Sequence, residues 1–123
     1  MASEIKVDTI VNAGGDNDSG IDLATNDTIK LNIAGAEKAR VDSSGNFLVG
    51  KTAQNHTDVG HTLYPAGGIS IVRDGSQCAV LNRLSSDGTI IDLRKDSTTV
   101  GSIGSRNGAF IYIANADGDS FAL

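Results

Sequence analysis

Short runs of alternating apolar and polar residues, separated by turn sequences, constrain the fold of this chain more than any other feature. Ile29, Leu31 and Ile33 alternate with Lys30 and Asn32, which is the period-two pattern of a strand with one buried face. Further short runs are expected to be strands: Phe47 and Val49, Ile69 and Ile71, Ile91 and Leu93, residues 110–113, and Ile5, Val7 and Thr9 at the N-terminus. No stretch of about twelve residues has helical apolar spacing without glycine or turn residues. The sequence predicts an all-β protein of short antiparallel strands and hairpins.

Turn sequences punctuate these runs at regular intervals. Their centres in the second half lie near residues 74, 87, 96, 107 and 117, and Asn107-Gly108 and Asp117-Gly118 are typical of tight hairpins. Such spacing predicts an antiparallel meander. We therefore expect an N-terminal attachment or shaft β region over residues 1–50, a linker or long loop over 51–66, and a β-meander domain over 67–123.

Bulky side chains are scarce in this chain. It has 123 residues with 15 glycines, one proline and no tryptophan, and three Phe and two Tyr supply all the aromatic rings. Hydrophobic residues amount to 39%, which is below the usual ~45–50%. A core built from one such chain would be small, so we expect other chains to help bury its apolar surface.

Charge and cysteine content exclude several classes of partner. The net charge is −5 and no basic cluster is present, which argues against nucleic-acid binding, where neutralised phosphates supply most of the affinity. No apolar run approaches the ~18 residues of a membrane span, and residues 1–5 lack the pattern of a secretion signal. Cys78 is alone, so it forms neither an intrachain disulfide nor a multi-cysteine metal site.

One segment, residues 45–52, matches the phosphate-binding pattern G-x-x-x-x-G-K-[ST] from Gly45 to Thr52. The chemistry of that pattern needs a preceding buried strand, a flexible loop and a following helix. Here a polar turn precedes Gly45, a strand-like run lies between the glycines, and no helical face follows Thr52. The segment is therefore predicted to be part of a β-hairpin rather than a nucleotide site.

Other candidate sites give no pattern of catalysis or cofactor binding. The run Asp16-Asn17-Asp18-Ser19-Gly20 is rich in oxygen ligands but fails the calcium-loop spacing, so a polar turn is expected. His56 and His61 are the only histidines and lack metal-ligand spacing, although a threefold axis could gather three copies of one of them. We therefore predict no enzyme activity, no catalytic, cofactor or metal residues, and an unknown ligand site.

Two segments resemble a known protein family. Residues 36–52, with the run Val41-Asp42-Ser43-Ser44-Gly45-Asn46-Phe47-Leu48-Val49-Gly50-Lys51-Thr52, and residues 81–104 resemble segments of tail-fibre and related virion proteins of tailed bacteriophages, especially marine ones. The opening, residues 1–7, is similar as well. Together these stretches cover about half the chain, and the resemblance also accounts for the false phosphate-binding match.

The resemblance implies a homotrimeric, β-rich shaft or knob on the virion, in contact with other virion proteins; a host surface glycan is a further candidate partner. We therefore expect a non-enzymatic, tail-fibre-like structural protein that contributes to host attachment. The alternatives are a carbohydrate-binding module, with Tyr64, Phe110 and Tyr112 as stacking residues, and a capsid-surface fibre or decoration protein. The expected trimer core positions are Ile29, Leu31, Ile33, Phe47, Val49, Ile69, Ile71, Leu93 and Ile103.

Overall fold

The structure is a computed structural model that describes residues 4–15 and 17–122. These residues form eleven β-strands and no helix, so the all-β prediction is confirmed. The chain divides into two compact units, unit 1 (Met1–Ala79) and unit 2 (Val80–Leu123). Each unit contains one antiparallel sheet.

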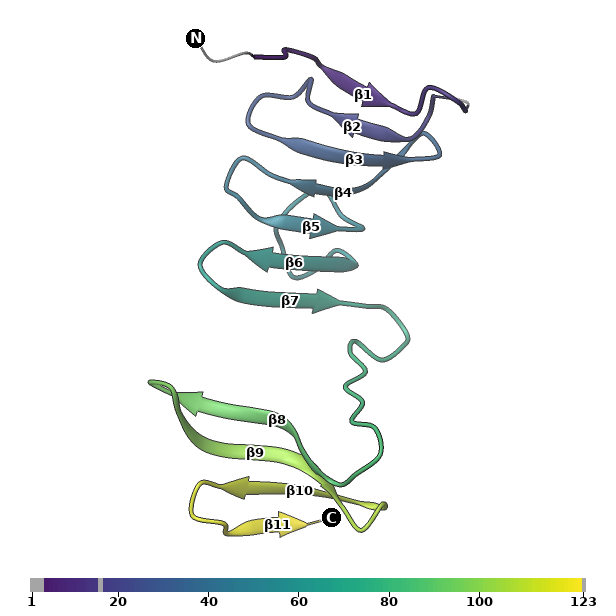
Figure 1. Cartoon of the computed structure of the whole chain (residues 1–123). Helices are drawn as coiled ribbons and strands as arrows, with labels where there is room; N and C mark the ends of the chain where they lie inside the picture. Colours follow the sequence, from purple (N-terminus) through teal and green to yellow (C-terminus); the bar gives the residue numbers. More distant parts are fainter. Residues whose placement is uncertain (1–3, 16, 123) are drawn as a thin grey trace. The chain divides into compact units, whose positions relative to one another are not determined.

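Unit 1 is a seven-stranded sheet in which every strand pairs with the next one along the chain (Figure 1). Tight turns make this possible, such as the one at Ala34-Gly35, where both residues have positive φ angles of 52° and 69°, as hairpin turns require. The strands are β1 (Thr9–Val11), β2 (Gly20–Asp22), β3 (Ile29–Ile33), β4 (Ala36–Val41), β5 (Phe47–Val49), β6 (Gly60–Tyr64) and β7 (Gly68–Val72).

The strand register sorts the side chains of unit 1 into two different faces. Residues paired across neighbouring strands point to the same side of a sheet. One row runs across all seven strands: Ile10, Ile21, Leu31, Ala39, Val49, His61 and Ile71. A second row on the same side joins Ile29, Val41, Phe47, Leu63 and Ile69. The opposite side carries Thr9, Asp22, Lys30, Arg40, Leu48, Thr62 and Ser70.

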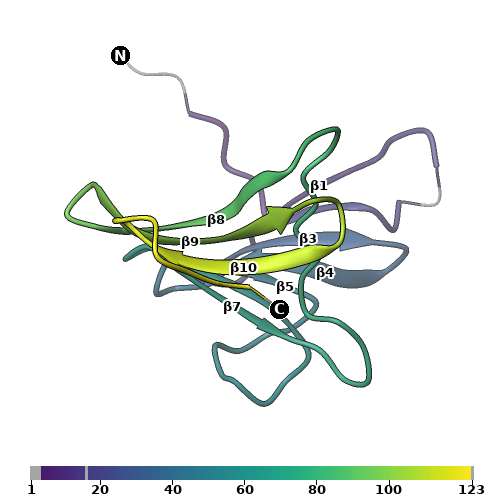
Figure 2. The same ribbon diagram turned by 90° about the horizontal axis from the view of Figure 1, so that it is seen from below.

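Unit 2 is a four-stranded meander in the order β11-β10-β9-β8, and Figure 2 shows β8, β9 and β10 running side by side. Its strands are β8 (Gly88–Lys95), β9 (Thr98–Arg106), β10 (Phe110–Asn115) and β11 (Ser120–Ala122). Positive φ angles at Asp96 and Ser97, and again at Asn107 and Gly108, form its first two turns. The register between β8 and β9 shifts twice, between Thr89 and Ile91 and between Leu93 and Arg94.

Few side chains are buried in either unit. Leu48 and Thr62 have no exposed surface, and Ala39, Asn46 and Lys51 are nearly buried. In the described part of unit 2, the buried residues are two glycines of β9, Gly101 and Gly104. Single-layer sheets explain this result, because a sheet hides its apolar face only against a second layer.

The structure corrects three details of the predicted strands. The N-terminal strand is Thr9–Val11, so Ile5 and Val7 lie outside it. Residues 73–87 are not a hairpin turn region within one meander, because β7 belongs to unit 1 and β8 to unit 2. Strand β9 is not indicated by the sequence pattern, because its small residues Gly101, Ser102 and Gly104 interrupt the apolar alternation.

The boundaries of the units also differ from the predicted ones at residues 50 and 67. Strand β6 (Gly60–Tyr64) occupies much of the predicted linker 51–66 and pairs with both β5 and β7. The sheet therefore runs without a break from β1 to β7. Residues 50–59, rather than 51–66, form the long loop.

Candidate interaction surfaces

The apolar face of unit 1 consists of the two rows of residues given above, together with Ile33 and Ala36, and the described residues of unit 1 leave it uncovered. Ile10 and Ile69 keep 53% and 63% of their surface exposed. Ile29, Leu31, Ile33, Val49 and Leu63 are also exposed, whereas Ile21, Val41, Phe47 and Ile71 are half-buried. Such a continuous apolar patch is unusual on a monomeric protein and marks an interaction site.

This face gathers seven of the predicted core residues: Ile29, Leu31, Ile33, Phe47, Val49, Ile69 and Ile71. Sequence reasoning missed Ile10 and Ile21, because β1 and β2 are three residues long and too short to show a period. It also missed His61 and Leu63, whose strand lies within the predicted linker. The alternation His61-Thr62-Leu63 was the available signal.

The opposite, polar face carries paired charges near β2, β3 and β4. Lys30 Nζ lies 3.4 Å from Asp22 Oδ2, and Arg40 donates two hydrogen bonds of 2.6 Å to the Glu37 carboxylate. The hydrogen bonds with Glu37 raise the pKa of Arg40 despite partial burial. For Asp22 the pKa is lowered, chiefly by the hydrogen bond from the Ala24 N–H and then by Lys30. The four charged side chains therefore form two ion pairs.

A strap, residues 50–59, covers the polar face between β5 and β7 (Figure 1). It is held there by side-chain hydrogen bonds from Gln54 to Tyr64 Oη (3.0 Å) and between His56 Nδ1 and Ser70 Oγ (3.2 Å). Lys51 is buried at the start of the strap and donates to the Asn55 carbonyl at 2.7 Å. Leu48 and Thr62 lose all their exposed surface on this side of the sheet.

Unit 2 also has an apolar face. Its register places Ile91, Ile103, Ile113 and Phe121 in one row across all four strands. Ile113 and Phe121 are 51% and 63% exposed. The predicted core residues Leu93 and Ile103 point to this same face, because Leu93 pairs with Gly101, two residues before Ile103.

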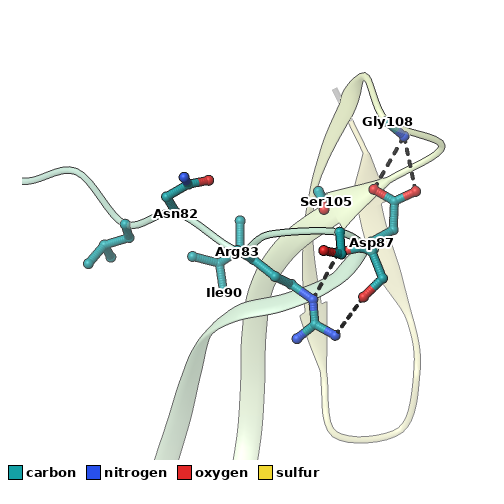
Figure 3. A pocket seen from close by; sticks show the side chains of 9 residues that line it. Asn82, Arg83, Asp87, Ile90, Ser105 and Gly108 are labelled. Carbon is teal, nitrogen blue, oxygen red and sulfur yellow. Dashed lines mark hydrogen bonds between the residues drawn. The ribbon is translucent and has the colours of Figure 1, made fainter.

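A polar hollow of about 530 Å³ lies beside the start of β8 in unit 2, and its principal charged groups are engaged within the protein (Figure 3). Arg83 donates to the Ser86 carbonyl at 3.0 Å and to Ser86 Oγ at 3.2 Å. The Asp87 carboxylate accepts the Gly108 N–H at 3.0 and 3.2 Å. Both side chains thus stabilise the loop before β8, and the described lining of the hollow offers no pair of free acid and base groups.

The segment 45–52 has the β-structure predicted for it. Phe47–Val49 is strand β5, and the turn before it is closed by Asp42. Lys51, the residue that would meet a phosphate, is buried with its ammonium group on the Asn55 carbonyl. No helix follows in the described chain, so the geometry that gives this pattern its phosphate chemistry is not built.

No group of three or more His, Cys, Asp or Glu is placed to hold a metal ion among the described residues. His56 lies in the strap and His61 on the apolar face, on opposite sides of the sheet. Cys78 is exposed. Of the predicted polar turn 16–20, Asp16 lies outside the described residues, and Gly20 begins β2. The described residues also contain no helix that could cross a membrane.

The three candidate stacking residues do not form one site. Tyr64 belongs to unit 1 and holds the strap, whereas Phe110 and Tyr112 lie two residues apart on one face of β10. The Arg106 guanidinium lies 5.5 Å from the centre of the Tyr112 ring, and Thr89 Oγ1 lies 3.2 Å from its hydroxyl. Phe110 is half exposed. Only these two rings could therefore act together.

Comparison with known proteins adds no relative to these observations. No known protein family matches the chain, and no similar protein was found among curated sequences or solved structures.

Proposed function

We propose that this chain is a non-enzymatic structural component of a bacteriophage virion, similar to a tail fibre, and that it assembles as a homotrimer. The observation that carries the proposal is the uncovered apolar face of unit 1. That face spans all seven strands and has no covering layer among the described residues of its unit. The resemblance of residues 36–52 and 81–104 to virion proteins supplies the biological setting.

The exposed area of the chain supports association. It is 9053 Å², whereas a compact monomer of 12.6 kDa would expose about 6,200 Å² and two separate compact domains of these lengths about 7,400 Å². The surplus over two separate compact domains exceeds the roughly 800 Å² that each partner buries in a stable interface.

The shape of unit 1 favours three copies arranged around an axis parallel to its strand stack. Neighbouring strands are about 4.8 Å apart, so seven strands extend for roughly 29 Å along such an axis. Three such sheets with their apolar faces inward would enclose a triangular core, while the charged pairs and the strap would face water. This arrangement also suits the few bulky side chains of the sequence.

A pair of neighbouring residues on β1 provides a matched test. Ile10 and Val11 are 53% and 48% exposed and point to opposite faces. We expect the wild-type protein to sediment with the mass of three 12.6 kDa chains at micromolar concentration. Ile10→Lys should shift this assembly toward single chains, because it buries an unpaired charge, and Val11→Lys should not.

A stable single chain at high concentration would contradict the homotrimer, and equal effects of the two lysines would contradict the assigned face. The virion assignment has a separate test. The chain should copurify with intact particles of the phage that encodes it, and antibody labelling should locate it on the tail. Labelling of the capsid would support the alternative of a capsid-surface fibre or decoration protein.

Glycan recognition is the second candidate function, favoured by Phe110 and Tyr112 on one face of β10. Two aromatic rings beside Arg106 could stack on a sugar and donate hydrogen bonds to it. A glycan array would test this candidate. Saccharide retention that is lost in Phe110→Ala but kept in Tyr64→Phe would support it, and no retention would exclude it.

A further inference from the structure

We infer that His61 makes the association of copies pH-dependent, so that assemblies loosen as the solution is acidified. This inference rests on the proposed homotrimer and concerns the regulation of the same apolar face. Among the fourteen positions of that face, thirteen are apolar and the remaining one is His61. It is the single titratable side chain at a paired position in the two described rows.

The surroundings of His61 are mainly apolar. Val49 of β5 and Ile71 of β7 flank it in the register, and its ring makes no hydrogen bond with the described residues. A hollow of about 340 Å³ beside it is lined by charged or titratable groups, Arg73, Asp74 and Cys78, and by apolar residues that include Val59 and Ile71. Arg73 disfavours a second positive charge there, and Asp74 favours it.

Covering this face changes the solvent around the imidazole. In a single chain the His61 side chain is exposed to water, which solvates the protonated imidazole as well as the neutral one. Against apolar side chains of another copy, the charged form is penalised far more than the neutral form. Separated copies therefore bind more protons than assembled ones, and by linkage a fall in pH favours separation.

The direction of the pH dependence distinguishes the effect of His61 from the effect of the protein's net charge. The chain carries a net charge of −5 at pH 7, and acidification reduces that charge and the repulsion between copies. Overall charge thus predicts tighter association at lower pH, whereas His61 predicts weaker association. With three copies, three imidazoles contribute, which makes the response steeper.

The chain supplies its own control in His56. That residue lies in the strap on the polar face, with Nδ1 3.2 Å from Ser70 Oγ, and it remains at the outer surface when the apolar faces meet. The two histidines therefore separate a protonation at the interface from a protonation elsewhere. Glutamine replaces either ring with a neutral polar side chain that does not titrate.

The test is sedimentation of the full chain over a range of concentrations between about pH 8 and pH 5. For the wild type and His56→Gln we expect the concentration at half-assembly to rise by about tenfold or more on acidification. In His61→Gln it should stay constant or fall. His61→Leu, which keeps the face apolar throughout, should remain assembled across the range and controls for a failure of the glutamine variant to associate.

Two outcomes would overturn the inference: an assembled wild type with no loosening at acid pH, or a His61→Gln protein that loosens as the wild type does. Both leave the homotrimer intact, because each requires an assembly at neutral pH. A wild type that is a single chain at every pH and concentration would instead overturn the proposed function, and the inference with it.

Discussion

In unit 1 the strap lies on the polar face of the sheet over β5 to β7, whereas in unit 2 the described loop before β8 reaches only the start of the sheet, where Arg83 donates to the Thr89 carbonyl. The consequence appears in the buried residues. Leu48 and Thr62 of unit 1 are fully enclosed, but the buried residues described in unit 2 are glycines that contribute no side chain. Two meanders of the same chain therefore differ in how much interior they make for themselves.

This difference indicates where each unit obtains its stability. Burial of a leucine side chain contributes about 1.5–3 kcal/mol, so unit 1 holds some stability independent of other chains. Unit 2 depends on strand ladders, turns and whatever covers its row of Ile91, Ile103, Ile113 and Phe121. We expect unit 2 to be the part of a separated chain that opens first.

The largest expected effect comes from Leu48→Ala. This substitution empties a fully enclosed site and should lower the free energy of unfolding by about 2–5 kcal/mol. Leu63→Ala is its counterpart on the apolar face, where Leu63 is 46% exposed. In urea unfolding at several protein concentrations, Leu48→Ala should destabilise at every concentration, whereas Leu63→Ala should destabilise mainly at concentrations where the copies associate.

If both leucine variants shared one concentration dependence, the distinction between the strap-covered face and the face covered by other copies would be wrong. A loss of less than about 1 kcal/mol in Leu48→Ala would show that the strap encloses little in solution.

The second prediction, with an effect of intermediate size, concerns the stability of unit 2. A Cβ atom on Gly104 would overlap the Gly88 carbonyl oxygen and lie 2.7 Å from Tyr112 Oη. Gly104→Ala should therefore destabilise unit 2 by about 1–3 kcal/mol. Hydrogen exchange should show faster exchange in β8 to β10 and unchanged protection in β3 to β7. Gly14→Ala is the control, because a methyl group on Gly14 would meet no atom within 4 Å.

Faster hydrogen exchange in β3 to β7 of Gly104→Ala would contradict the independence of the two units. Unchanged hydrogen exchange in β8 to β10 would show that the sheet can shift at Gly104 to accommodate a methyl group.

Much of the fold could be predicted from the sequence, because alternation and turn chemistry act locally. Ile29, Leu31 and Ile33 identify β3 by period alone, and Asn107-Gly108 identifies the turn between β9 and β10. The sequence does not predict strand β9, because Gly101 and Gly104 interrupt its alternation of apolar and polar residues. These glycines are explained by close contacts across the sheet, with the Ala114 carbonyl oxygen near Gly101 and Tyr112 over Gly104.

The candidate surface was predicted only in part for a related reason. Period two tells which residues of one strand share a face, but not which strands share a sheet. The pairing of Val49 with His61 joins two strands that are separated in sequence by the strap, a polar loop that contacts the sheet through Gln54 and His56. The sequence alone carried no signal of those contacts.

The smallest expected effect on the free energy of unfolding comes from substitutions in one turn of each unit. Asp42 holds the turn before β5: its carboxylate accepts the N–H groups of Ser44 and Asn46 at 3.0 and 2.9 Å and the Asn46 side-chain amide at 3.0 Å. Partial burial raises the pKa of Asp42, but these hydrogen bonds outweigh it, so the net pKa lies below the ordinary 3.8. Asp117, in the turn before β11, has no such set of bonds among the described residues.

Asp42→Ala should therefore lower the free energy of unfolding by about 1 kcal/mol at neutral pH, and Asp117→Ala by less. Because the pKa of Asp42 is lowered by folding, its contribution is present above about pH 4 and is lost as the pH falls through the folded value. Thermal or urea unfolding should thus show the gap between wild type and Asp42→Ala narrowing below about pH 4. A gap that stays constant down to pH values well below that range would mean that the carboxylate charge plays no part in holding the turn.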